Sequence, residues 1–416
     1  MKAGHLSTYF SGTASKRLSQ VEVNPRTSNQ HEFNGTLPLK SLLGLEKKTF
    51  AVRFVYLGQD EDETTLSEAS GTWYDSRANN PSRPAEYRLY YSPNDVIQRA
   101  AAGDLLVIAR RPEGDSLVLI IAQAGSAAEN SLKWLFQIEE QERKDPGRFE
   151  LRQIAGSDDR PLDYVARLVL EQIGEEITEE VPSQYLEMLV REFGGVFPTT
   201  REFSAFARKM MSEVSAVNDP DEALVAWLDF EEMLFRTLEK HLVREELERG
   251  FVDNGDVDVE RFVKFSLSVQ NRRKSRAGLA LENHLEHIFH KNQLRFAVRQ
   301  VTEQKSKPDF LFPGITEYRD SLFPPEQLAM LGAKFSCKDR WRQVLSEARR
   351  IENKHLLTLQ PGISADQTDE MQSHGLQLVL PRPIHRTYTP NQQSWIWSLS
   401  VFIEEVRKKQ TLARSL

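Results

Sequence analysis

The stretch of sequence that decides the fold is residues 308–343, PDFLFPGITEYRDSLFPPEQLAMLGAKFSCKDRWRQ. It contains two short apolar runs, Phe310–Phe312 and Leu331–Ser336, and each run predicts a strand. Asp309 directly precedes the first run, and Lys334 lies inside the second. We therefore expect a carboxylate and a lysine on two strands that follow each other along the chain.

The sequence on either side of this stretch alternates between helix and strand patterns. Before it, four apolar residues at i, i+4, i+7 and i+8 predict one buried face of a helix: Leu281, Leu285, Ile288 and Phe289. After it, the patterns predict a helix with the buried stripe Trp341, Val344, Leu345, Ala348 and Ile351, strands at Leu356–Leu359 and Leu376–Leu380, and a last helix over roughly 395–408. This order is typical of a mixed sheet flanked by helices.

At 416 residues the chain is too long for one ordinary core, and its patterns predict three regions. Residues 1–155 are expected to form a small, mostly-β barrel or sandwich, because short β-like runs alternate there with turn-rich stretches. Residues 156–218 are acidic and predict a helical linker. Residues 219–416 form the α/β region, and Asn218–Asp221 predicts the start of its first helix. The β-like runs are Phe50–Tyr56, Tyr87–Tyr91, Leu105–Ile108 and Leu117–Ile121.

Composition excludes several kinds of site and location. Cys337 is the single cysteine, so the sequence offers no internal disulfide and no cysteine-built zinc site. His284, His287 and His290 are spaced i, i+3, i+6, which drifts around a helix and does not predict a metal triad. No apolar run approaches the ~20 residues of a membrane helix, and residues 1–7 lack a secretory core. We therefore expect a cytoplasmic protein with no membrane partner.

The charge of the chain is unevenly distributed. The formal net charge of −7 argues weakly against a nucleic-acid partner. However, residues 338–350 (KDRWRQVLSEARR) carry five bases against two acids. A second basic group consists of Arg272, Arg273, Lys274 and Arg276. Local basic surfaces can bind phosphates whatever the total charge.

Four residues around the two predicted strands can carry phosphodiester hydrolysis. Glu282 lies on the helix before Asp309, and Glu347 lies on the helix after Lys334. Clustered carboxylates that hold Mg²⁺ neutralise the phosphate, and a nearby lysine can orient the attacking water. Two carboxylates and a lysine on adjacent strands is the arrangement of the PD-(D/E)XK nucleases. Here Gly332 stands where these nucleases usually have an acidic residue. On spacing alone there is an alternative interpretation, in which the Asp only starts a strand, the Lys is solvated and the Glu lies on the surface.

Three separate blocks resemble one nuclease family closely. Residues 271–289 (NRRKSRAGLALENHLEHIF), 308–313 (PDFLFP) and 333–343 (AKFSCKDRWRQ) resemble the EcoRII C-terminal catalytic domain family, and the likeness runs over about 200 residues. This resemblance implies an active site, in which Asp309 and Glu347 hold Mg²⁺, Lys334 positions the water and Glu282 adds carboxylate support. It also implies a PD-(D/E)XK, restriction-endonuclease-like α/β fold for the C-terminal region.

The resemblance also implies residues that contact DNA. Lys338, Asp339 and Arg340 follow the catalytic strand, where related nucleases read adjacent C·G pairs; Arg suits guanine O6 and N7, and Asp suits the cytosine amine. An exposed charged helix start is the alternative. The basic group Arg272, Arg273, Lys274 and Arg276 is expected to contact phosphates, with a solvated charge run as the alternative.

Residues 1–155 resemble the family's N-terminal domain, an effector-binding DNA pseudobarrel, much less than the C-terminal region resembles the catalytic domain. Two polar loops fit DNA binding, because Asn, Gln, Arg and Glu read base edges in the major groove. Their candidate residues are Asn29, Gln30, His31, Glu32, Asn34, Arg77, Arg83, Glu86 and Arg88. Ordinary surface loops, or a sensor of a modified base or another ligand, are the alternatives.

The sequence thus predicts a two-domain type II restriction endonuclease that cuts double-stranded DNA with Mg²⁺. By resemblance, the target contains a CC half and a GG half around a central base pair, and cutting leaves a 5′ phosphate. A two-fold homodimer would match the symmetry of such a site, and a cognate DNA methyltransferase is expected in the same system. Two alternatives remain: a modification-dependent nuclease, and a non-catalytic DNA-binding regulator on a nuclease fold.

Overall fold

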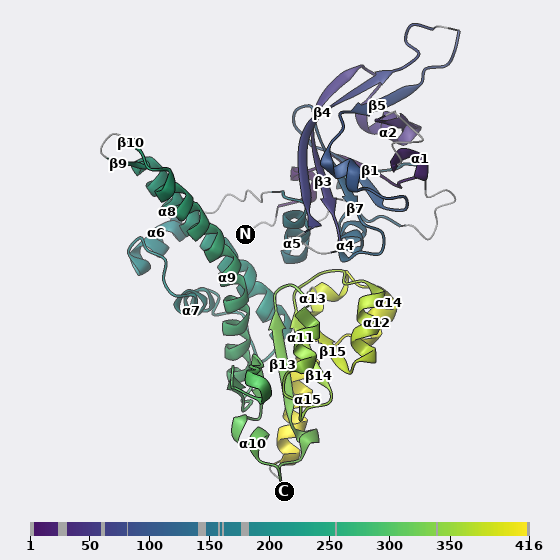
Figure 1. Cartoon of the computed structure of the whole chain (residues 1–416). Helices are drawn as coiled ribbons and strands as arrows, with labels where there is room; N and C mark the ends of the chain where they lie inside the picture. The colour runs from purple at the N-terminus through teal and green to yellow at the C-terminus, as the bar shows by residue number, and fades with distance from the viewer. Residues whose placement is uncertain are drawn as a thin grey trace. The chain divides into compact units, whose positions relative to one another are not determined.

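The computed structural model is divided into two compact units (Figure 1). It describes residues 4–23, 31–59, 63–80, 82–139, 147–156, 159, 162–175, 183–253, 256–337 and 340–413. The first unit is Met1–Thr178 with Pro361–Ser364, and the second is Glu179–Gln360 with Ala365–Leu416. Because the arrangement of the units is not determined, each is described by itself.

The first unit is built on an eight-stranded sheet with the order β2-β5-β4-β3-β7-β6-β1-β8. Neighbouring strands are antiparallel except β3 and β7, which are parallel. The strands are β1 Gly12–Arg17, β2 Glu32–Gly35, β3 Lys48–Leu57, β4 Thr65–Asp75, β5 Tyr87–Tyr91, β6 Leu105–Arg110, β7 Ser116–Ala122 and β8 Glu150–Gln153. The four β-like runs predicted from the sequence lie within β3, β5, β6 and β7, so these predictions are confirmed.

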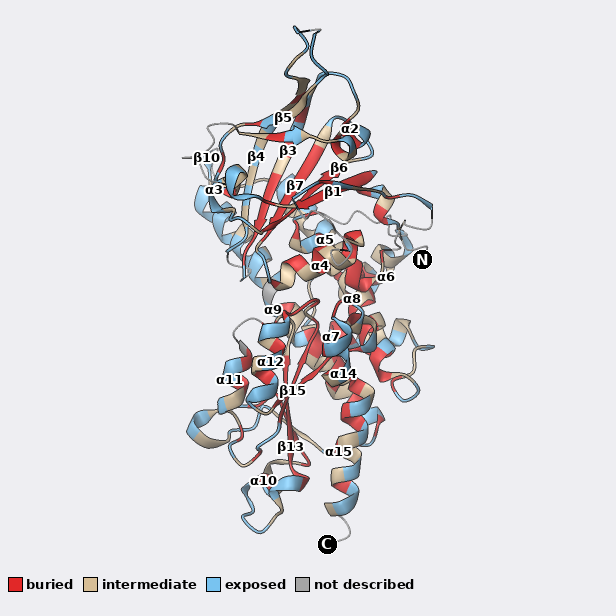
Figure 2. Ribbon diagram, turned by 90° about the vertical axis from the view of Figure 1, so that its right-hand side faces the viewer, coloured by how far each residue is buried: buried red, intermediate tan, exposed pale blue. Residues whose placement is uncertain are grey.

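Both faces of the central strands β6 and β7 are buried. Along β6, Leu105 and Val107 enter one core cluster and Leu106 and Ile108 enter another, as the period of two in a strand requires. Fully burying an aliphatic side chain contributes about 1.5–3 kcal/mol, which explains why these strands read as continuous apolar runs. Figure 2 shows the buried residues along the strands.

Short helices cover the two faces of the first sheet. Helices α4 (Ala127–Phe136) and α5 (Tyr164–Gln172) contribute to the first core cluster, and α2 (Leu37–Leu43) and α3 (Asp95–Arg99) contribute to the second. The remaining short elements are η1 Leu6–Thr8 and α1 Gln20–Val23. The mostly-β character predicted for residues 1–155 is present in this eight-stranded sheet, with short helices packed on it, while the pseudobarrel architecture stays a prediction.

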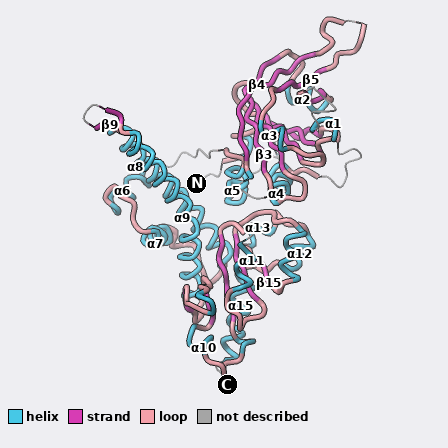
Figure 3. The backbone as a smooth tube through the Cα atoms, in the orientation of Figure 1, coloured by secondary structure: helices cyan, strands magenta, loops and turns pink. Residues whose placement is uncertain are grey.

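The second unit begins with four helices, α6 Ser183–Phe193, α7 Thr200–Met210, α8 Pro220–Arg249 and α9 Val259–Lys291. Helix α8 starts where the sequence predicts it, since Asp219 caps it by accepting a hydrogen bond from Glu222 N. Buried Asp221 accepts hydrogen bonds from Leu399 N and Ser400 N, which fixes the start of α8 to the last helix. Figure 3 shows α8 and α9 as two long helices, joined through the short strands β9 (Val252–Asp253) and β10 (Asp256–Val257).

A five-stranded mixed sheet forms the rest of the second unit, with the order β11-β12-β13-β14-β15. Its strands are β11 Ala297–Val298, β12 Phe310–Phe312, β13 Ala329–Lys334, β14 Lys354–Thr358 and β15 Leu376–Val379. The first three strands pair antiparallel and the last three pair parallel. The helices around it are η4 Glu303–Lys305, α10 Ile315–Arg319, η5 Pro325–Gln327, α11 Arg340–Ser346, α12 Ala365–Ser373, α13 Arg382–His385, α14 Pro390–Trp395 and α15 Leu399–Ala413.

Aromatic packing fixes α9 against this sheet. The predicted stripe Leu281, Leu285, Ile288 and Phe289 is fully buried. The ring of Phe289 meets Phe310 at 5.1 Å and Phe312 at 5.3 Å between centroids, edge to face. Phe402 of α15 packs on Phe312 at 5.6 Å. The same strand that begins after Asp309 is thus held between two helices.

Two helix predictions in this unit are wrong in extent. The helix with the stripe from Trp341 to Ile351 ends early, because α11 stops at Ser346 and Ala348 has a left-handed φ of 45°. The last predicted helix is split, since α14 ends at Trp395 and α15 starts at Leu399. In both places the apolar residues of the predicted stripes are buried except Leu345, which is half-buried, so the spacing identified the core and not the helix ends.

Across the described residues, no helix has the length and apolar character needed to span a membrane.

Candidate active site

Asp309 and Lys334 meet at the junction of β12 and β13. Lys334 Nζ donates to Asp309 Oδ2 at 2.8 Å, and Ala333 N donates to the same oxygen at 2.8 Å. The antiparallel register pairs Phe310 with Leu331, so Asp309 lies opposite Gly332 at the strand end. The structure therefore brings together the two residues that the strand patterns selected.

Gly332 explains why the second carboxylate does not come from the strand. A Cβ atom at this position would lie 2.9 Å from Val344 Cγ2, closer than side-chain carbons approach each other. Helix α11 thus packs directly on the β13 backbone. An Asp or Glu at position 332 would displace that helix.

Glu347 lies just beyond α11 and interacts electrostatically with Asp309. The expectation that it lies on the helix is corrected: the helix ends one residue earlier, at Ser346. Burial raises the pKa of Glu347 to about 7, and the negative charge of Asp309 acts in the same direction. Lys334 and Lys354 act in the opposite direction. The two carboxyl groups therefore share one poorly solvated environment.

Glu282 of α9 has a cationic partner that the sequence did not indicate. Arg299 Nη2 donates to Glu282 Oε1 at 2.6 Å. Burial raises the pKa of Glu282, the hydrogen bond from Arg299 lowers it, and the charge of Asp309 raises it. Glu282 also interacts electrostatically with Lys334, so it belongs to the same cluster.

The donor set of this cluster fits a magnesium ion. Among the described residues no three His, Cys, Asp or Glu side chains form a ready-made metal cluster. Mg²⁺ in phosphate-handling sites, however, takes one or two carboxylates and completes its shell with phosphate oxygens and water. Asp309 and Glu347 are two such oxygen donors whose mutual repulsion a cation would relieve.

The predicted base-reading segment lies mostly outside the described residues. Lys338 and Asp339 are not described, and Arg340 is described only as the first residue of α11. The side chain of Lys274 on α9 is likewise not described. Their DNA contacts stay predictions.

The other three residues of the predicted phosphate-binding group on α9 have contacts within the protein. The guanidinium of Arg272 lies 4.0 Å from the centre of the Phe197 ring, and Arg273 Nε donates to Glu239 at 2.7 Å with half of its side chain exposed. Arg276 is buried and pairs with Glu231 and Glu232. The charge of Arg276 is thus compensated inside the protein, which speaks against its predicted phosphate contact.

His284 also belongs to this buried group. Arg208 Nη1 lies 3.0 Å from His284 Nδ1, and because arginine can only donate, Nδ1 must accept. His284 Nε2 then carries the proton and faces Glu231 Oε2 at 2.9 Å. Burial lowers the pKa of His284, in keeping with a neutral ring. The histidine acts as a structural link between helices.

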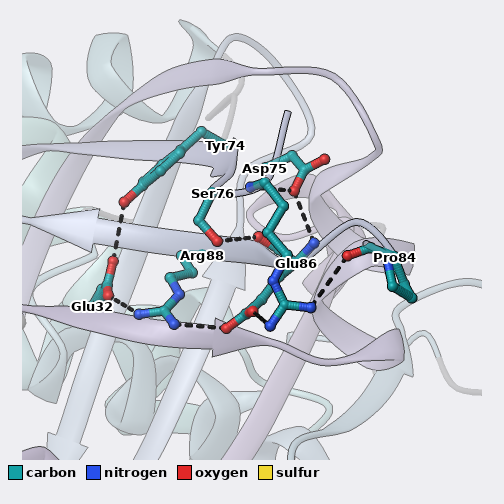
Figure 4. A network of polar contacts seen from close by, with 8 residues as sticks. Glu32, Tyr74, Asp75, Ser76, Pro84, Glu86 and Arg88 are labelled. Carbon is teal, nitrogen blue, oxygen red and sulfur yellow. Dashed lines mark hydrogen bonds and ion pairs between the residues drawn. The ribbon is translucent and has the colours of Figure 1, made fainter. Parts of the chain in front are cut away.

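The candidate residues of the first unit form a network of their own (Figure 4). Arg88 on β5 pairs with Glu32 of β2 and, at 2.6 Å, with Glu86. Arg77 pairs with Glu86, and Asp75 Oδ1 accepts hydrogen bonds from the backbone of both Arg77 and Glu86. Four candidates are thus held together at the ends of three neighbouring strands.

The other candidates of the first unit lie outside that network. Asn34 and Arg83 are exposed, and the ring of His31 lies 6.1 Å from that of Tyr91. Asn29 and Gln30 are outside the described residues. DNA binding by these residues stays a prediction.

An Asp–Lys pair on adjacent strands, with further carboxylates beside it, is the arrangement of the PD-(D/E)XK nuclease class. Residues 235–403 match the family model described as EcoRII C terminal. Over 229 residues the chain is 40% identical to the type II restriction enzyme EcoRII of Escherichia coli, and the match covers 55% of this chain and 55% of that protein. The chain thus matches about half the length of this curated relative.

Two solved structures have some similarity to the chain. The first is metal-depleted Ecl18kI in complex with uncleaved, modified DNA, at 17% identity and a TM-score of 0.44, covering 56% of this chain and 85% of that one. The second is the complex of restriction endonuclease PspGI with substrate DNA, at 17% identity and a TM-score of 0.42, covering 51% of this chain and 93% of that one.

Proposed function

We propose that this protein is a type II restriction endonuclease, which hydrolyses double-stranded DNA with Mg²⁺ at a short site containing CC and GG halves. The observation that carries the proposal is the 2.8 Å contact between Lys334 Nζ and Asp309 Oδ2 on adjacent strands, inside the segment that matches the family model described as EcoRII C terminal. The 40% identity to a type II restriction enzyme over 229 residues supports the same activity.

Each residue of the cluster has a distinct role in this proposal. Asp309 and Glu347 would hold Mg²⁺, which when bound polarises the phosphate and neutralises its charge. Lys334 would orient the attacking water from its position beside Asp309. The attack breaks the bond between phosphorus and O3′, which leaves a 5′ phosphate and a 3′ hydroxyl. Glu282 adds negative charge from α9.

Recognition of the site is assigned to two parts of the chain. Lys338, Asp339 and Arg340 would read base edges beside the cut, and Arg272, Arg273 and Lys274 would contact phosphates. Residues 1–155 would bind a further DNA copy or otherwise control activity, with 156–218 as the linker to a catalytic domain at 219–416. A homodimer would match a two-fold site, and a methyltransferase would protect the host DNA.

Digestion of DNA tests this proposal. Purified protein is incubated with unmethylated phage DNA in Mg²⁺ or in EDTA, and the fragment ends are sequenced. We expect discrete fragments that share one short motif in Mg²⁺ and intact DNA in EDTA. Random fragments would contradict sequence specificity.

The same assay separates the alternatives. Cutting of methylated DNA alone would replace the proposal with a modification-dependent nuclease. Specific binding without metal-dependent cutting of either DNA would identify a regulator on a nuclease fold.

A further inference from the structure

Arg299 is placed at the active site by the edge of the sheet. Strand β11 pairs antiparallel with β12, with Val298 opposite Phe310, so the next position brings Arg299 opposite Asp309. Arg299 N donates to Asp309 O at 3.1 Å, which extends the ladder by one residue. At this point the backbone of Arg299 has a left-handed φ of 49°, a conformation that residues with side chains rarely adopt. Such local strain is often found at functional sites.

The side chain of Arg299 is anchored at one end and open at the other. Its guanidinium contacts Glu282, whose side chain is only 15% exposed, while the Arg299 side chain itself is 50% exposed. A guanidinium has five N–H donors in a planar fork. The contact with one carboxylate oxygen therefore leaves donors available to a ligand that approaches the site.

The balance of charge in the cluster explains what Arg299 does when no DNA is bound. Asp309 is compensated by Lys334, and Glu282 is compensated by Arg299. Asp309 also interacts electrostatically with Arg299. A cation held by Asp309 and Glu347 would add positive charge to the cluster. The negative charge of Glu282 would then depend less on Arg299 for compensation.

We propose that Arg299 is a further DNA-contacting residue of this site, one that Glu282 holds in place in the free protein and that binds a phosphate oxygen of the bound strand beside the cut. The inference rests on the proposed nuclease function. Phosphate is the ligand that suits a half-exposed guanidinium next to a phosphodiester-hydrolysing cluster, because its oxygens match the planar fork in a bidentate contact. Sequence reasoning missed Arg299 because no periodic pattern marks it.

Binding measured over a range of salt concentrations tests this proposal. The wild-type protein and the Arg299→Ala and Arg299→Lys variants are titrated, in EDTA and in Ca²⁺, with a short fluorescent duplex that carries the motif found at the fragment ends. Each phosphate contact contributes roughly 0.9 to the slope of log K against log salt on duplex DNA. We expect Arg299→Ala to reduce this slope by about one contact and to weaken binding similarly for cognate and unrelated duplexes. Arg299→Lys should retain the slope, because it retains the charge.

Arg295→Ala is the matched control. Arg295 also forms an ion pair with a glutamate, Glu317, at 3.0 Å, and its side chain is 45% exposed, but it lies outside the cluster. Its replacement should leave the slope unchanged. Thermal unfolding of each variant confirms that it is folded.

The outcomes distinguish this inference from the proposed function. A salt slope for folded Arg299→Ala equal to that of the wild type would overturn the phosphate contact, even if cutting were slower; Arg299 would then only position Glu282. If Arg299 only positions Glu282, the Glu282→Gln variant should slow cutting to the same extent as Arg299→Ala. A wild-type protein that neither binds nor cuts the duplex would overturn the proposed function and this inference with it.

Discussion

Helix α9 contributes residues to two clusters of paired acids and bases, and the two clusters differ in how far their charged groups are buried. The closed cluster consists of Glu231, Arg276 and His284, all of which are buried. Glu231 accepts from Arg276 at 3.2 Å and faces His284 at 2.9 Å, so each charge meets its partner inside the protein. Such a network fixes how helices pack.

The open cluster consists of Glu282, Arg299, Asp309, Lys334 and Glu347. It contains one carboxyl group whose pKa is raised to about 7 and one guanidinium that is half exposed. A group with a raised pKa beside an opening to solvent is typical of a functional site. The burial of the charged groups, more than their presence, therefore distinguishes the two clusters.

The largest expected effect comes from Lys334→Ala in the open cluster. Cutting should fall by about 10²–10³-fold or more, as when a catalytic electrostatic contact is removed, while specific DNA binding stays largely intact. Initial rates of cleavage and binding in Ca²⁺ measure the two properties. Lys305→Ala, at an exposed lysine of η4, is the control and should cut normally. Loss of DNA binding by a folded Lys334→Ala variant would refute the assigned role.

In the closed cluster, Glu231→Ala should affect stability instead. Removing one partner of a buried ion pair costs about 3–5 kcal/mol, because His284 would stay buried without its acceptor and Arg276 would keep only Glu232. Urea unfolding measures this loss. The control is Glu286→Ala, which breaks the exposed pair with Arg201 and should cost about 0–1 kcal/mol. Equal losses for the two variants would show that burial does not set the difference.

Gly332→Ala should weaken the link between the sheet and Glu347. The added methyl group would meet Val344, and overpacking of this kind costs about 1–3 kcal/mol. The displacement of α11 should also slow cutting. Adding Val344→Ala should restore part of the rate, because it removes the methyl group that clashes. A Gly332→Ala variant with wild-type stability and rate would contradict the close packing.

The smallest effect is expected from Arg340→Ala, which should reduce discrimination at one guanine. The cost should be about 1–3 kcal/mol at that base pair, with non-cognate binding nearly unchanged. Competition between duplexes that differ at a single position measures it. An unchanged site preference would end the base-reading role of Arg340.

The sequence predicted the strands around the site better than it predicted the partners of charged residues. Apolar runs selected β12 and β13, and with them the neighbouring positions of Asp309 and Lys334. A buried strand needs apolar residues, so its position can be predicted directly from an apolar run in the sequence. The end of α11 was missed, because the left-handed turn at Ala348 leaves no mark in the apolar spacing.

Arg276 and Arg299 show why the rest could not be predicted. Arg276 belongs to a basic run, but its partner Glu231 lies 45 residues earlier, on α8. Arg299 stands in no run, yet the sheet register brings it to Asp309. A run of charges in the sequence does not reveal which of them are paired in the fold.

A side-by-side comparison of Asp309→Asn and Glu231→Gln tests the central claim most directly, that the open cluster cuts DNA and the closed cluster holds the helices. The measurement is the cleavage rate and the unfolding temperature of both variants in Mg²⁺. We predict that Asp309→Asn unfolds near the wild-type temperature and does not cut, and that Glu231→Gln unfolds at a lower temperature but cuts while folded. A cutting Asp309→Asn variant, or a stable Glu231→Gln variant that does not cut, would contradict this account.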